Sequence, residues 1–153
     1  MNIQDYLSRQ QVPFQRLVHQ PAPTSSRRAN SVHTHCRQVA KTVLLKNLDG
    51  QLLVAVLPAD KKIDWLKLAT TTGKTGWRLA TEEQTSRVFS DCEMGAWPPF
   101  GALYGVATVV DDSFHADSEI LVEGNHRHED YRMSFHDYLR TAEPDQAKIS
   151  RSS

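Results

Sequence analysis

The chain has 153 residues, with 18 basic and 18 acidic side chains and therefore no formal net charge at pH 7. This length suits one domain with a buried core. The shares of hydrophobic residues, 39%, and of charged residues, 24%, are ordinary for a soluble globular protein. The balanced charge argues against a broad, electrostatically driven nucleic-acid interface, although it allows a small one.

The sequence carries no signal for membrane insertion or for a disulfide framework. No apolar run approaches the roughly 20 residues of a membrane-spanning helix, and the first residues lack the basic and apolar regions of a signal peptide. Cys36 and Cys92 fit neither a disulfide framework nor a metal-binding spacing. We therefore expect a cytoplasmic protein with reduced thiols and no membrane contact.

The first predicted elements are short. Apolar residues at helical spacing predict an amphipathic helix over 2–11, which Pro13 ends. A strand is expected over 14–19, and a polar helix over 25–33.

The strongest local pattern is a β-hairpin. Two apolar, β-rich runs, 42–48 and 51–57, are joined by Asp49 and Gly50, which tolerate the positive φ angles of a tight turn. Both runs are apolar nearly throughout, which predicts central strands that are covered on both faces.

The rest of the chain alternates irregularly between helices and strands. Thr81 to Gln84 shows the capping-box pattern of a helix start, and Ser134 caps the last helix. The expected elements are a helix over 63–71, a strand over 77–80, a helix over 82–90, strands over 104–110, 120–123 and 130–133, and a helix from 135 to about 140. We expect the polar segment 142–153 to form a frayed tail after a domain of residues 1–141.

These elements predict an α+β fold, a single domain with a mixed, curved β-sheet flanked by helices. A doubly wound parallel sheet fits less well, because the hairpin is antiparallel. The sequence has no internal repeat, no glycine-rich dinucleotide motif and no Walker loop.

Three separated segments carry the candidate chemistry. Lys41 lies at the mouth of an apolar strand, where its ammonium group could hold a phosphate or polarise a carbonyl. The loop from Gly95 to Gly101 contains Pro98 and Pro99, which stiffen it, and its free amides could donate to a developing oxyanion. A solvated edge lysine and a plain surface loop are the alternative interpretations.

The third segment is the polar turn of Gly124, Asn125, His126, Arg127 and His128. Its two imidazoles are too few for a structural zinc site, and adding His33, His35 and Cys36 would need long-range convergence. We therefore expect no metal and no cofactor, with one histidine lining a pocket.

Nucleophilic catalysis by a side chain lacks support. There is no GxSxG elbow, and neither cysteine has a neighbouring base in sequence. Asp111 and Ser113 end a strand, where the carboxylate could orient a substrate amine or cap a turn.

Taken in order, these segments resemble the YbaK/ProX family, the editing domain associated with prolyl-tRNA synthetase. The matching elements are Ala40–Leu45, Ala55–Asp60, the GxxxP loop Gly95–Pro99, the VDxS element Val110–Ser113 and the turn Gly124–His126. The resemblance covers about residues 3–140 and implies a partly barrel-like sheet. It also implies hydrolysis of the ester between a wrong amino acid and the 3′ end of a tRNA, as translational quality control.

The same resemblance assigns roles to particular residues. Lys41, Gly95 and His126 would be catalytic, with Lys41 on the terminal adenosine and His126 shaping the amino-acid pocket. Hydroxyl groups of the substrate would activate the attacking water. The substrate-binding set would be Pro99, Phe100, Gly101, Asp111, Ser113, Gly124, Asn125 and His128.

The expected partners are the 3′ end of an aminoacyl-tRNA, with Ala, Cys or Ser on tRNA-Pro as candidates, and prolyl-tRNA synthetase. Three alternatives stay open: a tRNA-end or oligonucleotide-end binding module without turnover, a metal-dependent hydrolase and a structural or interaction protein.

Overall fold

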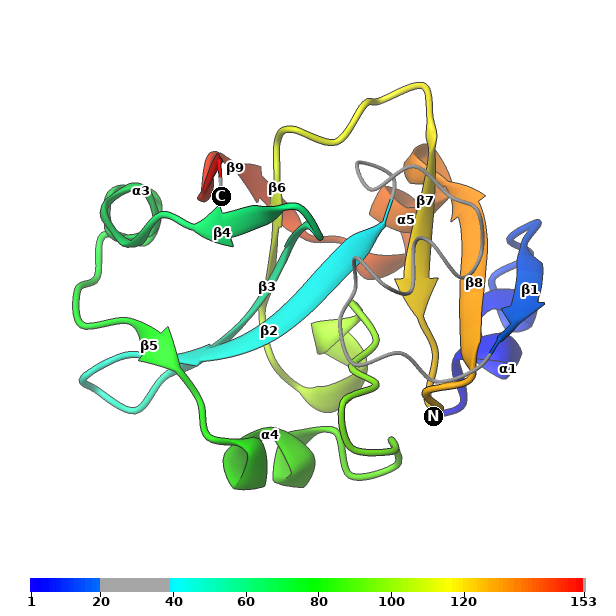
Figure 1. The fold of residues 1–153 in the computed structure, drawn as a ribbon, viewed down its shortest axis with the longest axis horizontal. Helices are drawn as coiled ribbons and strands as arrows, with labels where there is room; N and C mark the ends of the chain where they lie inside the picture. The colour runs from blue at the N-terminus through cyan, green and yellow to red at the C-terminus, as the bar shows by residue number, and fades with distance from the viewer. Residues whose placement is uncertain (20–38, 153) are drawn as a thin grey trace.

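The computed structural model describes residues 1–19 and 39–152. Its largest sheet has five strands in the order β5-β2-β3-β6-β9 (Figure 1). β2 pairs antiparallel with β3 and β5, whereas β6 pairs parallel with β3 and β9. The strands are β2 (Ala40–Lys46), β3 (Leu52–Pro58), β5 (Arg78–Leu79), β6 (Thr108–Asp111) and β9 (Asp145–Ala147).

Two smaller antiparallel sheets complete the β-structure. One has the order β1-β8-β7, and the other pairs β10 with β4. Their strands are β1 (Gln15–Val18), β7 (Glu119–Glu123), β8 (Glu129–Ser134), β4 (Lys61–Ile63) and β10 (Ser150–Ser152).

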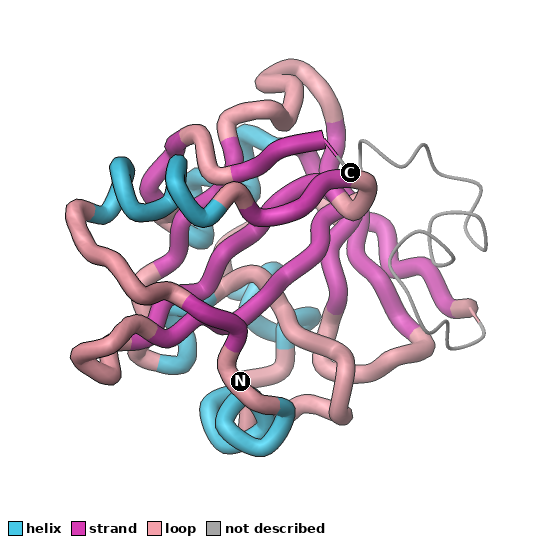
Figure 2. The backbone as a smooth tube through the Cα atoms, turned by 60° about the vertical axis from the view of Figure 1, so that its left-hand side comes forward, coloured by secondary structure: helices cyan, strands magenta, loops and turns pink. Residues whose placement is uncertain are grey.

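The helices are short and lie around the strands (Figure 2). They are α1 (Ile3–Arg9), α3 (Trp65–Thr72), α4 (Glu82–Val88), α5 (Phe135–Ala142) and the 3₁₀ helix η2 (Gly101–Tyr104). None of the helices in the described part of the chain is long and apolar enough to cross a membrane.

The five-stranded sheet has a hydrophobic cluster on each face. Leu44 and Val54 belong to the larger cluster, together with α1, α5 and the aromatic residues Phe89 and Phe100. Leu45 and Leu53 belong to the smaller cluster, under α3. Because side chains alternate along a strand, Thr42 faces the larger cluster and Lys41 the smaller one.

The predicted fold class is confirmed. The domain is α+β with a mixed sheet, and the hairpin, the Thr81 capping box and the Ser134 cap form as expected. The described strands form three sheets and no closed barrel. The helix predicted over 25–33 lies outside the described residues.

Two expectations are wrong. Residues 101–104 form a 3₁₀ helix that ends at Gly105 (φ 72°), so the strand expected from 104 begins only at Thr108. The segment expected to fray does not do so over its described residues, 142–152, because β9 and β10 pair with β6 and β4 and Ile149 is fully buried between them.

Candidate active site

The loop from Gly95 to Gly101 is anchored in the core by its second half. Pro99 and Phe100 are buried, and Phe100 packs edge-on against Tyr6 and Tyr138. The hydroxyl of Tyr138 donates to the Pro99 carbonyl at 2.8 Å. These contacts make Pro99 and Phe100 the fixed base of the loop.

Gly101 is required by close packing. Its amide donates to Thr108 Oγ1 at 3.0 Å. A Cβ at this position would lie 2.5 Å from the Val106 carbonyl oxygen and would also collide with Thr108. The glycine therefore lets the loop fold back onto the start of β6.

Gly95 is the exposed part of the loop, and its φ of +89° favours glycine. Four of the five non-proline amides in the loop already have acceptors, those of Ala96, Trp97, Phe100 and Gly101. Among the described residues, the Gly95 amide has no acceptor. It is the donor that this loop can offer to a substrate.

The turn after β7 packs beside this loop. Glu123 accepts a hydrogen bond from the Trp97 amide at 2.8 Å, and the Asn125 carbonyl accepts one from the Glu93 amide at 2.8 Å. The side chain of Arg127 passes 3.8 Å from where a Cβ of Gly95 would lie. The structure therefore brings the second and third predicted segments together.

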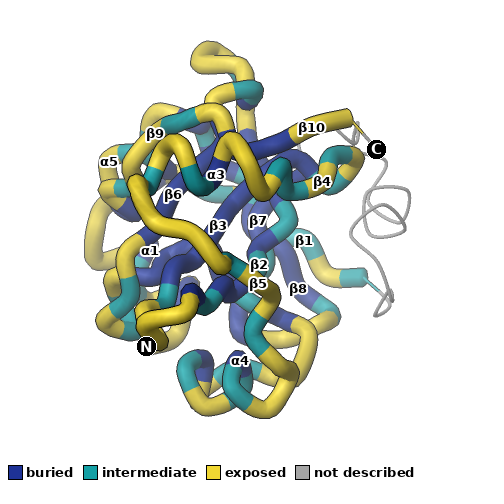
Figure 3. Tube along the Cα trace, turned by 90° about the vertical axis from the view of Figure 1, so that its left-hand side faces the viewer, coloured by how far each residue is buried: buried dark blue, intermediate teal, exposed yellow. Residues whose placement is uncertain are grey.

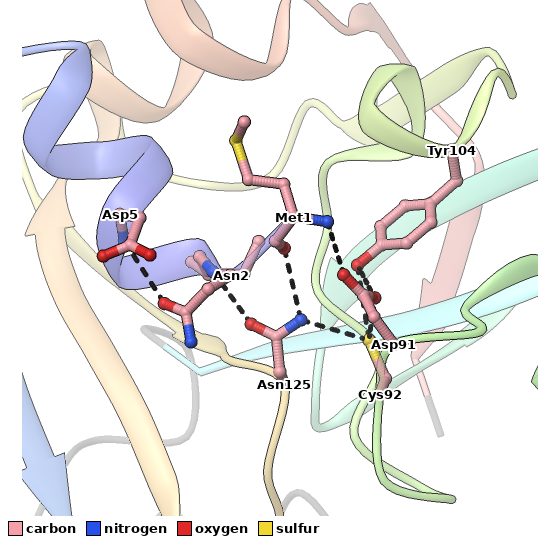
Figure 4. Close-up of polar contacts among 8 residues, drawn as sticks. Met1, Asn2, Asp5, Asp91, Cys92, Tyr104 and Asn125 are labelled. Carbon is pink, nitrogen blue, oxygen red and sulfur yellow. Dashed lines mark hydrogen bonds and ion pairs between the residues drawn. The ribbon is translucent and has the colours of Figure 1, made fainter.

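Gly124 and Asn125 hold this turn in place rather than facing solvent. A Cβ at Gly124 would lie 2.5 Å from the Tyr131 ring. Asn125 is buried, accepts a hydrogen bond from the Ile3 amide at 2.8 Å and donates to the Met1 carbonyl and to Cys92 Sγ (Figure 4). Asn125 thus ties α1 to the segment before Gly95.

The two histidines of the turn lie at the surface. Their rings stack with centroids 5.5 Å apart, and His126, with a side chain 48% exposed, has Nδ1 3.8 Å from a carboxylate oxygen of Glu93. The His128 carbonyl accepts a hydrogen bond from the His19 amide. Within the described ranges, no group of three or more histidine, cysteine, aspartate or glutamate residues is placed to hold a metal ion.

Asp111 is a buried carboxylate with a complete set of donors. The amides of Ser113 and Ile149 and the hydroxyls of Ser113 and Ser150 all donate to it. Burial by itself would raise the pKa of Asp111, but these hydrogen bonds outweigh it and lower the pKa. Asp111 therefore holds the C-terminal segment at Ile149 and Ser150, and Ser113 holds Asp111 in place.

One pocket opens beside the exposed end of the loop. It has a volume of about 200 Å³ and lies between β2, β5, α4 and Gly95. Thr42, Thr85 and Glu82 supply its polar side chains. The remaining lining residues are Val43, Leu44, Leu79, Ala80, Met94 and Trp97. We call it the Gly95 pocket.

Lys41 lines a second pocket, of about 360 Å³, which we call the Lys41 pocket. Its other lining residues are Val43, Leu57, Lys62, Ile63, Trp65, Leu79 and Arg151. The Lys41 ammonium donates to the Lys61 carbonyl. Burial lowers the pKa of Lys41, Asp60 raises it and Lys62 lowers it further.

The two pockets lie on opposite faces of β2 and meet at its outer edge, where both are lined by Val43 and Leu79. Figure 3 looks onto this side, with β4 and α3 above β2 and with α4 below it. Lys41 is therefore separated from Gly95 by the strand, although both approach the same edge.

That edge of β2 is open beside Thr42. The Ala80 amide donates to the Leu44 carbonyl, so the backbone groups of Leu44 point outward. By the two-residue alternation of a strand, those of Thr42 point the same way. β5 pairs only with Leu45 and Lys46, so the outward groups of Thr42 have no partner among the described residues.

The sequence did not point to Thr42 or Glu82. The alternation of side chains along 40–46 would have placed Thr42 opposite Lys41, but nothing local shows that Glu82 faces a pocket as well as starting a helix.

Comparison with known proteins agrees with this architecture. A crystal structure of the hypothetical protein APE2540 superposes with a TM-score of 0.87 at 17% sequence identity, over 97% of this chain and 99% of the other. A proposed trans-editing enzyme for prolyl-tRNA synthetase gives 0.80 at 18% identity, over 98% of this chain and 95% of the other. A scaffold protein used for computational epitope grafting gives 0.81 at 17% identity, over 99% and 96%. At these identities the likeness shows a shared fold.

The fold defines a small α+β domain with two pockets at one edge of its largest sheet. The family model of the aminoacyl-tRNA editing domain matches residues 19–141, which is most of the chain. The chain therefore belongs to the aminoacyl-tRNA editing domain family. A search of curated proteins found no matching relative.

Proposed function

We propose that the protein is a freestanding aminoacyl-tRNA deacylase that hydrolyses the ester of a mischarged tRNA. The observation that carries this proposal is the meeting of the Gly95 and Lys41 pockets at the open edge of β2. An aminoacyl-adenosine has a small amino-acid part and an anionic nucleotide part, and the two pockets suit these two parts.

The Gly95 pocket takes the amino acid. Its volume of about 200 Å³ is below the range of drug-sized ligand sites, which favours a small side chain. The Glu82 carboxylate at its wall would attract the α-ammonium group of the substrate. Ala, Cys or Ser on tRNA-Pro are the proposed substrates, because one structural neighbour is described as a trans-editing enzyme for prolyl-tRNA synthetase.

The Lys41 pocket takes the terminal adenosine. The Lys41 side chain is half-buried, so its ammonium is screened less from a phosphate or ribose oxygen than a surface lysine would be. The open backbone groups of Thr42 lie between the two pockets, where they can hold the ester in position.

Hydrolysis then proceeds without a covalent enzyme intermediate. Water attacks the ester carbonyl carbon, the amide of Gly95 donates to the developing oxyanion, and the bond to the ribose oxygen breaks as that oxygen takes a proton. The neighbouring ribose hydroxyl positions the water and accepts its proton while passing its own proton to the departing ribose oxygen. The thiol of Cys92 is a poor nucleophile because burial raises its pKa to about 11. His126 and His128 form the polar rim beside Gly95.

The test is hydrolysis of labelled Ala-, Cys-, Ser- and Pro-tRNA-Pro by the wild type and by single variants. We expect one mischarged species to be hydrolysed, with kcat/KM reduced about 100-fold or more by Gly95→Ala, which misplaces the amide donor. Lys41→Ala should weaken hydrolysis strongly, whereas Lys46→Ala, a lysine on the same strand, should not.

Comparing His126→Ala with His128→Ala identifies which imidazole contacts the substrate. Addition of prolyl-tRNA synthetase tests it as a partner. Binding of these tRNAs without release of amino acid would contradict the deacylase and favour a binding module of the same fold.

A further inference from the structure

The Lys41 pocket holds more positive charge than one terminal phosphate requires. Besides Lys41, on which the Asp60 carboxylate acts, it is lined by Lys62 and Arg151, and in the described residues neither of these two forms an ion pair. Lys62 and Arg151 lie directly opposite each other in the β4–β10 pairing. Like charges in that position repel and destabilise a strand pair, so an anion between them would stabilise it.

An aromatic side chain, Trp65, also lines the Lys41 pocket. Trp65 begins α3 and is 44% exposed. Its indole N–H has no acceptor in the described part of the chain, whereas that of Trp77 donates to Thr72 at 2.9 Å. A large exposed ring beside unpaired cations is the combination that binds single-stranded nucleic acid, with a base stacked on the ring and phosphates on the cations.

The charge of the surrounding segment supports this assignment. The chain is neutral overall, but residues 60–78 contain five basic and two acidic side chains, and residues 81–93 contain one basic and four acidic. Of the two acidic side chains in residues 60–78, Asp64 accepts a hydrogen bond from the Lys67 amide at the start of α3. A polyanion would therefore approach from the side of α3 and β4 rather than from that of α4 (Figure 3).

We infer that Trp65, Lys62 and Arg151 form a binding site for the unpaired nucleotides that precede the terminal adenosine of the tRNA. One base stacks on Trp65, and its flanking phosphates lie between Lys62 and Arg151. The inference rests on the proposed function for the identity of the RNA. The stacking site itself is independent of hydrolysis.

The first experiment measures the binding of an uncharged RNA hairpin with a single-stranded 3′-ACCA end, using the same hairpin with a blunt end as reference. We expect the wild type to prefer the ACCA hairpin. Trp65→Ala should weaken its binding about 5- to 150-fold, and Trp65→Phe should retain most of the affinity. Trp77→Phe is the matched control and should bind like the wild type. In a Trp77→Phe, Trp97→Phe background, which leaves Trp65 as the single tryptophan of the three in the sequence, quenching of its fluorescence by the hairpin would report stacking.

The salt dependence of binding distinguishes the contribution of the cations from that of the Trp65 ring. Lys62→Ala and Arg151→Ala should each reduce the slope of log Kd against log salt by about 0.7, while Arg87→Ala on α4 should leave it unchanged. Trp65→Ala should lower affinity without changing the slope. Equal binding of the blunt hairpin, or wild-type affinity of Trp65→Ala, overturns the inference.

These results do not depend on turnover. If Trp65-dependent binding is found while no mischarged tRNA is hydrolysed, the site stands and the deacylase proposal fails. If hydrolysis is found with KM unchanged by Trp65→Ala, the deacylase stands and the site fails. Loss of binding to an acidic peptide in these variants, with RNA binding unchanged, would make the surface a protein-docking site and would also overturn the inference.

Discussion

At the scale of single residues, partners decide what a polar side chain does. Asp111 and Asn125 both belong to segments that resemble functional motifs. In the structure, however, their hydrogen bonds go to the protein itself, to Ile149 and Ser150 for Asp111 and to Ile3 for Asn125. These donors lie 38 to 122 residues away in sequence, so no local pattern could have predicted them. Only the bonds from Ser113 to Asp111 are local, and they match the turn cap that the sequence allowed.

Asp111 makes the stability of the fold depend on pH. Its hydrogen bonds lower its pKa below the value of about 3.9 in an unfolded chain. The stabilisation is therefore present above that value and is lost as the pH falls through the folded pKa. We expect Asp111→Asn to reduce the free energy of unfolding at pH 7 by about 1.5–3 kcal/mol, and the difference from the wild type to shrink below pH ~3.9.

Urea denaturation between pH 2 and pH 7 measures this difference. Asp112→Asn is the control, because its carboxylate is exposed and lies 3.6 Å from Lys148. Its effect should stay below about 1 kcal/mol. A cost of Asp111→Asn that is the same at every pH would contradict the role assigned to the charge.

Cys92 should react slowly with alkylating agents. Burial, followed by the nearby Asp91 carboxylate, raises the pKa of its thiol to about 11. In a Cys36→Ala background, the rate of alkylation by iodoacetamide should rise about tenfold per pH unit up to that value, because the thiolate is the reactive form. Half-maximal reaction near pH ~8.5, the ordinary value for a cysteine, would show that the thiol is not desolvated.

At the scale of elements, the sequence predicted the turns and helix starts that depend on residues close together in the chain. The Asp49–Gly50 turn, the Thr81 capping box and the Ser134 cap each involve residues a few positions apart, and all three form as predicted. The register of β2 and β3 follows from the hairpin.

The elements that sequence reasoning missed are short strands held by distant partners. β4, β9 and β10 have three residues each and no two-residue apolar alternation. β9 forms on the open edge of β6, β4 and β10 form by pairing with each other, and Ile149 between β9 and β10 fills the smaller core cluster. The candidate site was predicted in part. The Gly95 loop and the turn at 124–128 lie together as expected, whereas Lys41 lies on the other face of β2.

The C-terminal strands should contribute substantially to stability. Ile149 is fully buried in the smaller cluster. We expect Ile149→Ala to reduce the free energy of unfolding by about 2–5 kcal/mol, measured by urea denaturation. Gln146→Ala, at an exposed position in β9, should change it by less than about 0.5 kcal/mol. Equal effects of the two substitutions would indicate that the segment frays in solution.

At the scale of the whole molecule, the chain is neutral, with a basic segment at residues 60–78 and an acidic one at 81–93, and its RNA interface should be small. With Lys41, Lys62 and Arg151 as the phosphate-binding cations, log Kd for a tRNA should change with log salt with a slope of about 2. Titrations between 50 and 300 mM salt would measure it. A slope above about 5 would require a much broader interface than the Lys41 pocket provides.

The pairing of β1 with β8 has a consequence for biosynthesis. β1 comprises residues Gln15–Val18, and its neighbour in the sheet comprises Glu129–Ser134. At a synthesis rate of about 5–20 residues per second, β1 waits roughly 6–23 seconds for its partner to be made. During that interval its backbone groups are exposed to other chains. Until the C-terminal third has emerged, β1 therefore lacks the strand with which it pairs in the folded protein.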